Sequence, residues 1–141
     1  MLVRLLYASR AAPSVEPDDL QAILRQSKLA NPHLGITGLL CLSDGIFLQV
    51  LEGGRGAVNR LYAKSVADPR HTQVELLLYQ QVSERRFAAW AMGVVDLSRL
   101  NRSMLLKYSP TAALDPYAVS GEASLALFEE LAATASVMAQ A

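Results

Sequence analysis

The chain begins with alternating apolar residues and then changes to a helical pattern. Residues 2–9 have a period of two, which predicts a strand. One face of this strand would carry Val3, Leu5, Tyr7 and Ser9. After Pro13 and Pro17, residues 18–30 follow spacings of three and four, which predicts a helix with Asp18 and Asp19 in its first turn. Its stripe is Leu20, Ile23, Leu24, Ser27 and Asn31. The polar end of this stripe fits a helix end that reaches water as well as it fits a bound ligand.

Residues 35–51 predict a β-hairpin, because two apolar runs flank Asp44-Gly45, a dipeptide typical of tight turns. In the second run, Phe47, Gln49 and Leu51 share a face. Residues 52–56 are rich in glycine and lead into a predicted helix at 57–67. Its helically spaced residues are Val58, Leu61, Tyr62 and Ser65, and Asp68-Pro69 ends it. The glycine-rich segment lacks the residues of a phosphate-binding loop, so we interpret it as a plain turn.

Two further strands and a helical tail are predicted after residue 70. The strands are residues 73–82 and 89–95, and the second would place Trp90, Met92 and Val94 on one face. Arg85-Arg86 lies between them, and we interpret this pair as a solvated loop. The tail carries helical stripes at Leu100, Met104 and Leu105, and then at Leu125, Phe128, Leu131 and Ala132 within a helix from about 120 to 140.

This order of elements predicts an α+β fold of the ferredoxin-like βαββαββ type. Right-handed crossovers would place both early helices on one face of a mixed five-stranded sheet. The helical tail would then cover the other face as a cap.

Gln49 is the least expected residue in this pattern, because it interrupts the apolar run of residues 46–51. A buried amide without hydrogen-bond partners costs roughly 1–3 kcal/mol. We therefore expect a partner for Gln49 inside the protein.

Composition narrows the class of protein. With 141 residues, 52% of them hydrophobic and 18% charged, the chain fits one globular domain. Its 13 basic and 13 acidic residues cancel, so we expect no nucleic-acid partner. Cys41 is the single cysteine, no apolar run approaches the roughly 20 residues that span a bilayer, and residues 1–4 do not start a signal peptide. We expect a cytoplasmic protein without a membrane partner.

Residues for enzyme chemistry are sparse. His33 and His71 are the only histidines, no nucleophile–base arrangement stands out, and His71 with Asp68 is too small a set for a metal site. The fold instead gathers four polar residues, Tyr7, Ser27, Asn31 and Gln49. Strands 2–9 and 46–51 are neighbours in this topology, so Tyr7 and Gln49 can meet beneath the helices. The amide of Asn31 could pair with a uracil-like ring edge.

Four segments resemble the BLUF domain, the blue-light sensor using flavin. They are Leu5-Leu6-Tyr7-Ala8-Ser9, the run Asn31-Pro-His-Leu-Gly-Ile-Thr-Gly-Leu-Leu, the run Gly45-Ile-Phe-Leu-Gln-Val-Leu-Glu-Gly53, and Arg86-Phe87-Ala-Ala-Trp90-Ala-Met92. The resemblance covers residues 1–97 as the photosensor domain. Residues 98–141, including Leu106-Lys107-Tyr108-Ser109, resemble the helical cap of short members that lack an output domain.

The resemblance implies a non-covalent flavin between the two early helices, FAD in most members, with FMN or riboflavin as alternatives. It implies that Tyr7 donates an electron and a proton, that Gln49 bridges Tyr7 to the ring, and that Asn31 holds the ring edge. Ile23 would pack on the ring, and Ser27 would lie near Tyr7. Lys64, Asp68 and His71 match positions at the pyrimidine end. Ser65 departs from the family, where an aliphatic side chain often stacks on the ring, so either weaker flavin retention or a shifted ring is expected.

The implied photochemistry changes hydrogen bonds rather than covalent bonds. Trp90 and Met92 would be alternative neighbours of Gln49, and the signal would leave through their strand to an unidentified effector protein. We also expect a homo-oligomer and no enzyme activity. The rival hypotheses are a flavin-dependent redox enzyme, which would need a substrate entry beside the ring, and a cofactor-free interaction module of the same fold.

Overall fold

A computed structural model describes residues 1–95, 101–134 and 137–138, apart from the side chains of Pro17, Leu20, Val137 and Met138. The elements up to residue 82 are those that the pattern predicts, with bounds shifted by a few residues. They are β1 (Leu2–Ala11), α1 (Pro17–Leu34), β2 (Thr37–Ser43), β3 (Ile46–Gly54), α2 (Arg55–Ala67) and β4 (His71–Val82). They are followed by β5 (Gly93–Val95), α3 (Arg102–Tyr108), α4 (Gly121–Ala133) and β6 (Val137–Met138).

The sheet has the strand order β4-β1-β3-β2-β5-β6. The pairing of β2 with β5 is parallel and every other pairing in this order is antiparallel, which gives the predicted mixed sheet. The hairpin turn forms as predicted, with positive φ angles of 50° at Asp44 and 76° at Gly45. In the register of β1 against β3, Tyr7 lies directly opposite Gln49.

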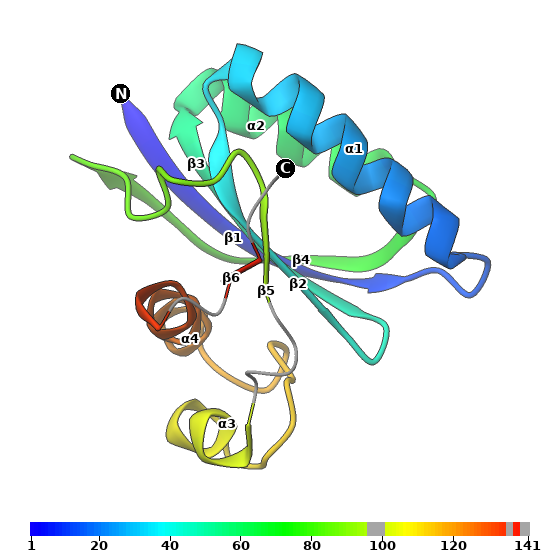
Figure 1. Cartoon of the computed structure of the whole chain (residues 1–141), viewed down its shortest axis with the longest axis vertical. Helices are drawn as coiled ribbons and strands as arrows, with labels where there is room; N and C mark the ends of the chain where they lie inside the picture. Colours follow the sequence, from blue (N-terminus) through cyan, green and yellow to red (C-terminus); the bar gives the residue numbers. More distant parts are fainter. Residues whose placement is uncertain (96–100, 135–136, 139–141) are drawn as a thin grey trace.

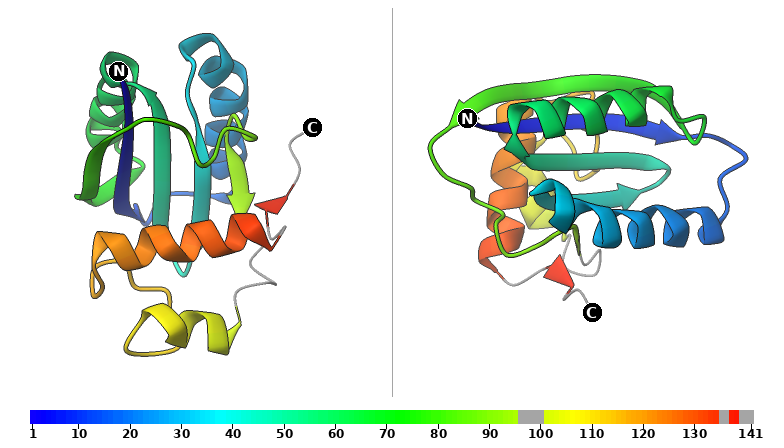
Figure 2. Two further views of the ribbon diagram at one scale, coloured as in Figure 1. Left: turned by 90° about the vertical axis from the view of Figure 1, so that its left-hand side faces the viewer. Right: turned by 90° about the horizontal axis from the view of Figure 1, so that it is seen from above.

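Helices cover both faces of the sheet. Figures 1 and 2 show α1 and α2 side by side on one face and α3 and α4 on the other, as the topology predicts. One apolar cluster lies under α1 and α2 and includes Val3, Leu5, Tyr7, Phe47, Leu51 and Val58. A second cluster lies under the cap and includes Leu6, Leu48, Val50, Leu125, Phe128 and Leu131. Because side chains alternate between the two faces of β1 and β3, each of these strands contributes residues to both apolar clusters.

Helix α1 continues beyond its predicted end at residue 30. It passes through Pro32 and ends at Gly35, whose φ of 67° is the left-handed conformation that glycine adopts without strain. The N–H of Ile36 donates to the carbonyl of Asn31 at 3.0 Å and closes this end. The extension keeps Asn31 inside the helix and 1% exposed, so this residue at the polar end of the stripe is buried, whereas Ser27 is partly exposed.

The prediction of a strand over residues 89–95 is wrong for its first half. Only Gly93–Val95 forms β5, and the preceding segment is an irregular loop. Trp90 packs against the cluster under the cap, whereas Met92 is buried in the cluster under α1 and α2. The two side chains do not share a face, because side chains alternate regularly only along a strand.

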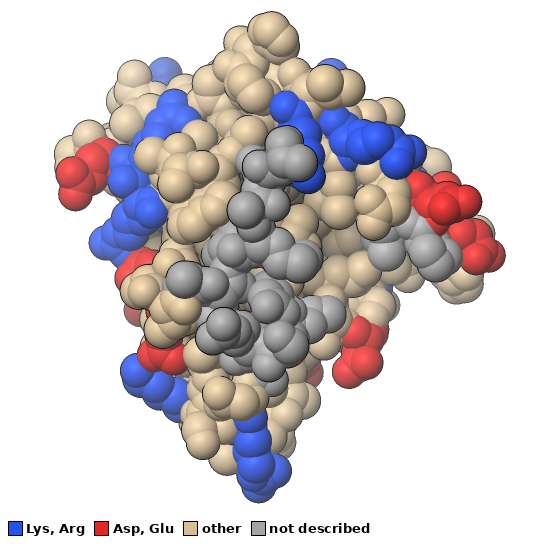
Figure 3. Space-filling view, in the orientation of Figure 1, with Lys and Arg blue, Asp and Glu red and all other residues tan. Residues whose placement is uncertain are grey.

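The tail also differs from its prediction. Helix α4 ends at Ala133, not near residue 140, and Val137–Met138 adds a two-residue strand beside β5. Leu100 and the proposed domain boundary between residues 97 and 98 lie outside the described residues. Within the described parts of the chain, no helix combines the length and apolarity needed to cross a bilayer. On the face in Figure 3, basic and acidic side chains are interspersed rather than gathered by sign.

Candidate functional site

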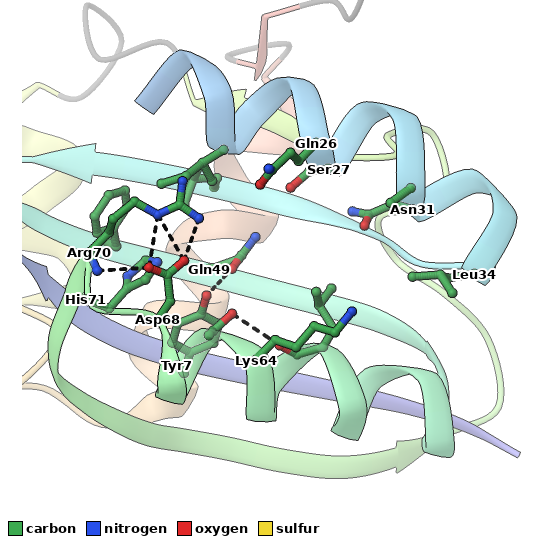
Figure 4. A pocket seen from close by; sticks show the side chains of 16 residues that line it. Tyr7, Gln26, Ser27, Asn31, Leu34, Gln49, Lys64, Asp68, Arg70 and His71 are labelled. Carbon is green, nitrogen blue, oxygen red and sulfur yellow. Dashed lines mark hydrogen bonds and ion pairs between the residues drawn. The ribbon is translucent and has the colours of Figure 1, made fainter. Parts of the chain in front are cut away.

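A cavity of about 410 Å³ lies between α1 and α2, above the centre of the sheet. The structure brings every candidate residue for cofactor binding to its wall. These are Tyr7, Ile23, Ser27, Asn31, Gln49, Lys64, Ser65, Asp68 and His71. Figure 4 shows Asp68, Arg70 and His71 at one end, Asn31 and Leu34 at the other, and Gln49 between them. Its volume falls within the range of small-molecule sites, roughly 300–1,000 Å³.

Tyr7 and Gln49 form a buried hydrogen-bonded pair on the floor of this cavity. The Tyr7 hydroxyl donates to Oε1 of Gln49 across the β1–β3 pairing. Tyr7 is 2% exposed and Gln49 is 9% exposed, so water has little access to compete for this hydrogen bond. Burial is the main cause that raises the pKa of Tyr7 to about 12, because the phenolate would lose its hydration. Tyr7 therefore keeps its proton at neutral pH.

The other end of the Gln49 amide faces Met92. Nε2 of Gln49 lies 3.3 Å from the sulfur of Met92, which is fully buried. A thioether is a weak acceptor, so this contact leaves most of the donor capacity of the amide unused. In this structure, Met92 rather than Trp90 is the neighbour of Gln49.

Asn31 is held by its amide nitrogen, which donates to the carbonyl of Ala91 at 2.8 Å. Among the described residues, no hydrogen bond reaches its Oδ1. An amide that is 1% exposed on a cavity wall thus offers an unpaired acceptor, a group that is costly unless a ligand or water bonds to it. This is the arrangement that a ring N–H would satisfy.

The charged end of the cavity is also ordered by hydrogen bonds. Arg70 binds both carboxylate oxygens of Asp68, with the closest contact at 2.5 Å, and lowers the pKa of that carboxyl. Nδ1 of His71 lies 2.8 Å from the hydroxyl of Ser9, and its ring packs on Phe47. Burial is the main cause that lowers the pKa of His71. Neutral His71 and the Asp68–Arg70 ion pair thus form a polar, nearly charge-balanced end.

Ser65 sits beside Tyr7 on the α2 side of the cavity. Its hydroxyl donates to the carbonyl of Leu61 at 3.3 Å within the helix, and a hydrogen bond with Ser65 lowers the pKa of Tyr7 against the larger effect of burial. The ring of Tyr62 packs 5.4 Å from that of Tyr7. Ser27 lines the cavity from α1, whereas Tyr7 lines it from β1.

Arg70, Gln26 and Leu34 are wall residues that sequence reasoning missed. Arg70 carried a detectable signal, because it follows the helix end at Asp68-Pro69 by one residue and can fold back onto Asp68. Among the described residues, no group of three or more His, Cys, Asp or Glu side chains could hold a metal ion.

The cavity fits a flat, partly polar ring. Its floor and walls combine apolar side chains with the unpaired Oδ1 of Asn31, the underused amide of Gln49 and the Asp68–Arg70 ion pair at one end. Fold and cavity together define a small-molecule-binding domain with a buried tyrosine–glutamine pair.

Comparison with known proteins identifies the family. The family described as BLUF, sensors of blue-light using FAD, matches residues 2–93. Photoactivated adenylate cyclase subunit beta of Euglena longa is 36% identical over 110 residues, which are 77% of this chain and 12% of that relative. BlsA in its photo-activated state superposes with a TM-score of 0.85 at 30% identity, over 93% of this chain and 94% of that one. Klebsiella pneumoniae BlrP1 with FMN and cyclic diGMP gives a TM-score of 0.69 at 31% identity, over 92% and 35%.

The chain therefore belongs to the BLUF family, and its first 93 residues include a blue-light sensor domain that binds flavin. It spans only 12% of the length of the Euglena longa relative, whose cyclase name describes that whole protein.

Proposed function

We propose that the chromophore of this sensor is FAD and that Tyr7 and Gln49 form its light-driven switch. The observation that carries the proposal is the buried hydrogen bond from the Tyr7 hydroxyl to Oε1 of Gln49 on the floor of the cavity. FAD follows the description of the family, and the FMN of the Klebsiella pneumoniae relative makes FMN the alternative.

Each wall of the cavity would have a role in holding the flavin. Asn31 would accept from the ring N–H through its unpaired Oδ1, and Ile23 would pack on the ring face. Gln49 would donate to the carbonyl and ring nitrogen at the same edge. Asp68, Arg70 and His71 would contact one end of the flavin, Lys64 would approach it from α2, and Ser65 and Ser27 would border it.

A bound flavin would supply the absorption of blue light and, when excited, an electron acceptor. Tyr7 would be the electron donor, and its hydroxyl proton would move along the existing bond to Oε1 of Gln49. A neutral Tyr7, with a pKa of about 12, holds that proton until light arrives. The proton and electron then return to Tyr7.

Gln49 suits this exchange because the two ends of its amide have nearly equal size and opposite hydrogen-bond character. Rotation or tautomerisation changes which group faces Tyr7 without changing the volume that the side chain fills. A difference of about 1.4 kcal/mol between the two arrangements would bias a coupled equilibrium tenfold. Trp90 and Met92 lie on opposite faces of the sheet, so their segment can carry the change toward the cap.

We further propose that the protein is not an enzyme and that it acts on a separate effector protein. The family assignment supports a sensing role, and relatives such as the cyclase of Euglena longa carry their activity within much longer chains. Homo-oligomerisation is supported by β4, an edge strand with Leu76 and Tyr79 exposed. The single, free Cys41 is in keeping with a cytoplasmic location.

Reconstitution tests the choice of flavin. The flavin-free protein would be titrated with FAD, FMN and riboflavin, and each complex would be illuminated with blue light while its visible spectrum is recorded. We expect all three to bind through the ring, FAD most tightly. Equal affinities would contradict the choice of FAD, and steady consumption of a reduced cofactor under light would favour the redox-enzyme alternative.

A further inference from the structure

Glu52 is a buried carboxylate that the photochemistry does not use. It lies on β3 three positions after Gln49, on the opposite face of the sheet, opposite Arg4 of β1. Glu52 is 0% exposed and Arg4 is 2% exposed. Burying two charges to this extent is costly unless they pair with each other and their remaining hydrogen-bonding groups find partners.

The carboxylate of Glu52 meets that requirement by binding three partners. Oε2 accepts from Nε and Nη2 of Arg4 at 2.8 and 2.7 Å. Oε1 accepts from the backbone N–H of Phe87 at 2.7 Å, and both oxygens lie 3.0 Å from the N–H of Arg86. Glu52 therefore fixes the start of the loop whose end carries Met92.

The rest of this loop is attached to β2, the strand that pairs with β3 in the hairpin, and to α1. Arg85 donates to the hydroxyl of Thr37 at 3.1 Å, and the carbonyl of Trp90 accepts from the N–H of Gly38 at 3.0 Å. The carbonyl of Ala91 accepts from Asn31. The loop thus runs from the buried ion pair under the cap to the sulfur that faces Gln49.

These attachments differ in strength. The contact between Nε2 of Gln49 and the thioether of Met92 is weak and cannot by itself hold a loop. Backbone N–H groups that donate to a buried carboxylate make stronger, charge-assisted bonds. Glu52 therefore holds the start of this loop more strongly than Gln49 holds Met92 at its end.

We propose that Glu52 is a positioning residue for the photoswitch, which holds Met92 against Gln49 through its bonds to the N–H groups of Arg86 and Phe87. The proposal rests on the switch role of Gln49 proposed above. The neighbour of Gln49 sets the relative energies of its two amide arrangements. Loosening the loop should therefore change how fast the illuminated protein returns to its dark spectrum.

Two charge-free double variants separate this role from that of the ion pair. R4M/E52Q keeps an oxygen that can accept from the two N–H groups, whereas R4M/E52M does not. Replacing both charges avoids leaving either one buried alone, which is the strongly destabilising case. R86A is the matched control, because it removes the side chain that pairs with Glu129 but leaves the backbone N–H in place.

The dark-recovery rate constant of the flavin-loaded full chain is the readout. We expect R4M/E52M to differ from R4M/E52Q by at least about fivefold, with R86A within about twofold of the parent chain. The same pair would be compared in an M92L background, where the difference should shrink to less than about twofold. A fold-stability effect alone would persist in that background.

Equal recovery in the two folded double variants would overturn the proposal, as would a difference that M92L leaves unchanged. If R4M/E52M does not fold, Glu52→Asp replaces it, since it retracts the carboxylate by one methylene and keeps its charge. A folded E52D chain with parental recovery would also overturn the proposal. Failure of the parent chain to respond to light would instead contradict the proposed switch itself.

Discussion

The hydrogen bond between Tyr7 and Gln49 should appear as a coupling energy in the stability of the flavin-free protein. Tyr7→Phe leaves Oε1 of Gln49 buried without its donor, and Gln49→Leu leaves the Tyr7 hydroxyl buried without its acceptor. Each single change should lower the free energy of unfolding by about 1–3 kcal/mol, because both groups are at most 9% exposed. The double variant removes both polar groups, so it should lose about 1–3 kcal/mol less than the sum of the single losses.

Urea unfolding of the four proteins, followed by circular dichroism, measures these terms. The apolar packing of the new leucine against Met92 is present in both the Gln49→Leu and the double variant, so it cancels in the cycle. The slope of free energy against urea should stay constant, which shows that the change lies in stability. Additive losses, within about 0.5 kcal/mol, would refute a buried Tyr7–Gln49 bond.

Three further outcomes follow from the site. Burial raises the pKa of Tyr7 in the folded protein from 10.0 to about 12. The stability that this residue contributes is therefore fully present below pH 10 and is lost as pH rises toward 12. In urea titrations, the free energy of unfolding of the parent chain should fall in this range about 1.4 kcal/mol per pH unit more steeply than that of Tyr7→Phe. The pKa of His71 is lowered in the folded protein, so the stability it contributes is present above its ordinary value of 6.5 and falls as pH drops through the folded pKa. In thermal melts, His71→Gln should therefore show a smaller loss of stability on acidification than the parent chain. An unchanged loss would contradict a lowered pKa for His71. Asn31→Ala should weaken FAD binding by about tenfold or more in fluorescence titrations, whereas undiminished affinity would mean that Asn31 only anchors Ala91.

Alternation along the first and third strands was sufficient to predict the centre of the site. A period of two placed Tyr7 and Gln49 on the helix-covered face, and the topology made their strands neighbours. The roles of Lys64, Asp68 and His71 came from family resemblance, since no spacing rule brings them to one wall.

The sequence could not predict which of Trp90 and Met92 faces Gln49. The alternation rule assumes a strand, and the residues before Gly93 instead form a loop, at whose start the N–H of Phe87 donates to the carboxylate of Glu52. Glu52 belongs to the same β3 strand as Gln49 but acts on the opposite face. A long-range bond from a side chain to a backbone N–H leaves no periodic signal in the sequence. The ion pair of Arg70 with Asp68 is local, because the two residues are only two positions apart, and its geometry depends on how the chain turns after α2.

The most direct test of the Tyr7–Gln49 switch is the blue-light-minus-dark absorption spectrum of the flavin-loaded chain and of its Tyr7→Phe variant. The parent chain should show a red shift of the flavin bands that reverses in the dark, because the rearranged Gln49 amide donates more strongly to the ring. Tyr7→Phe should retain flavin and show no such shift. A normal, reversible shift in Tyr7→Phe would contradict the account.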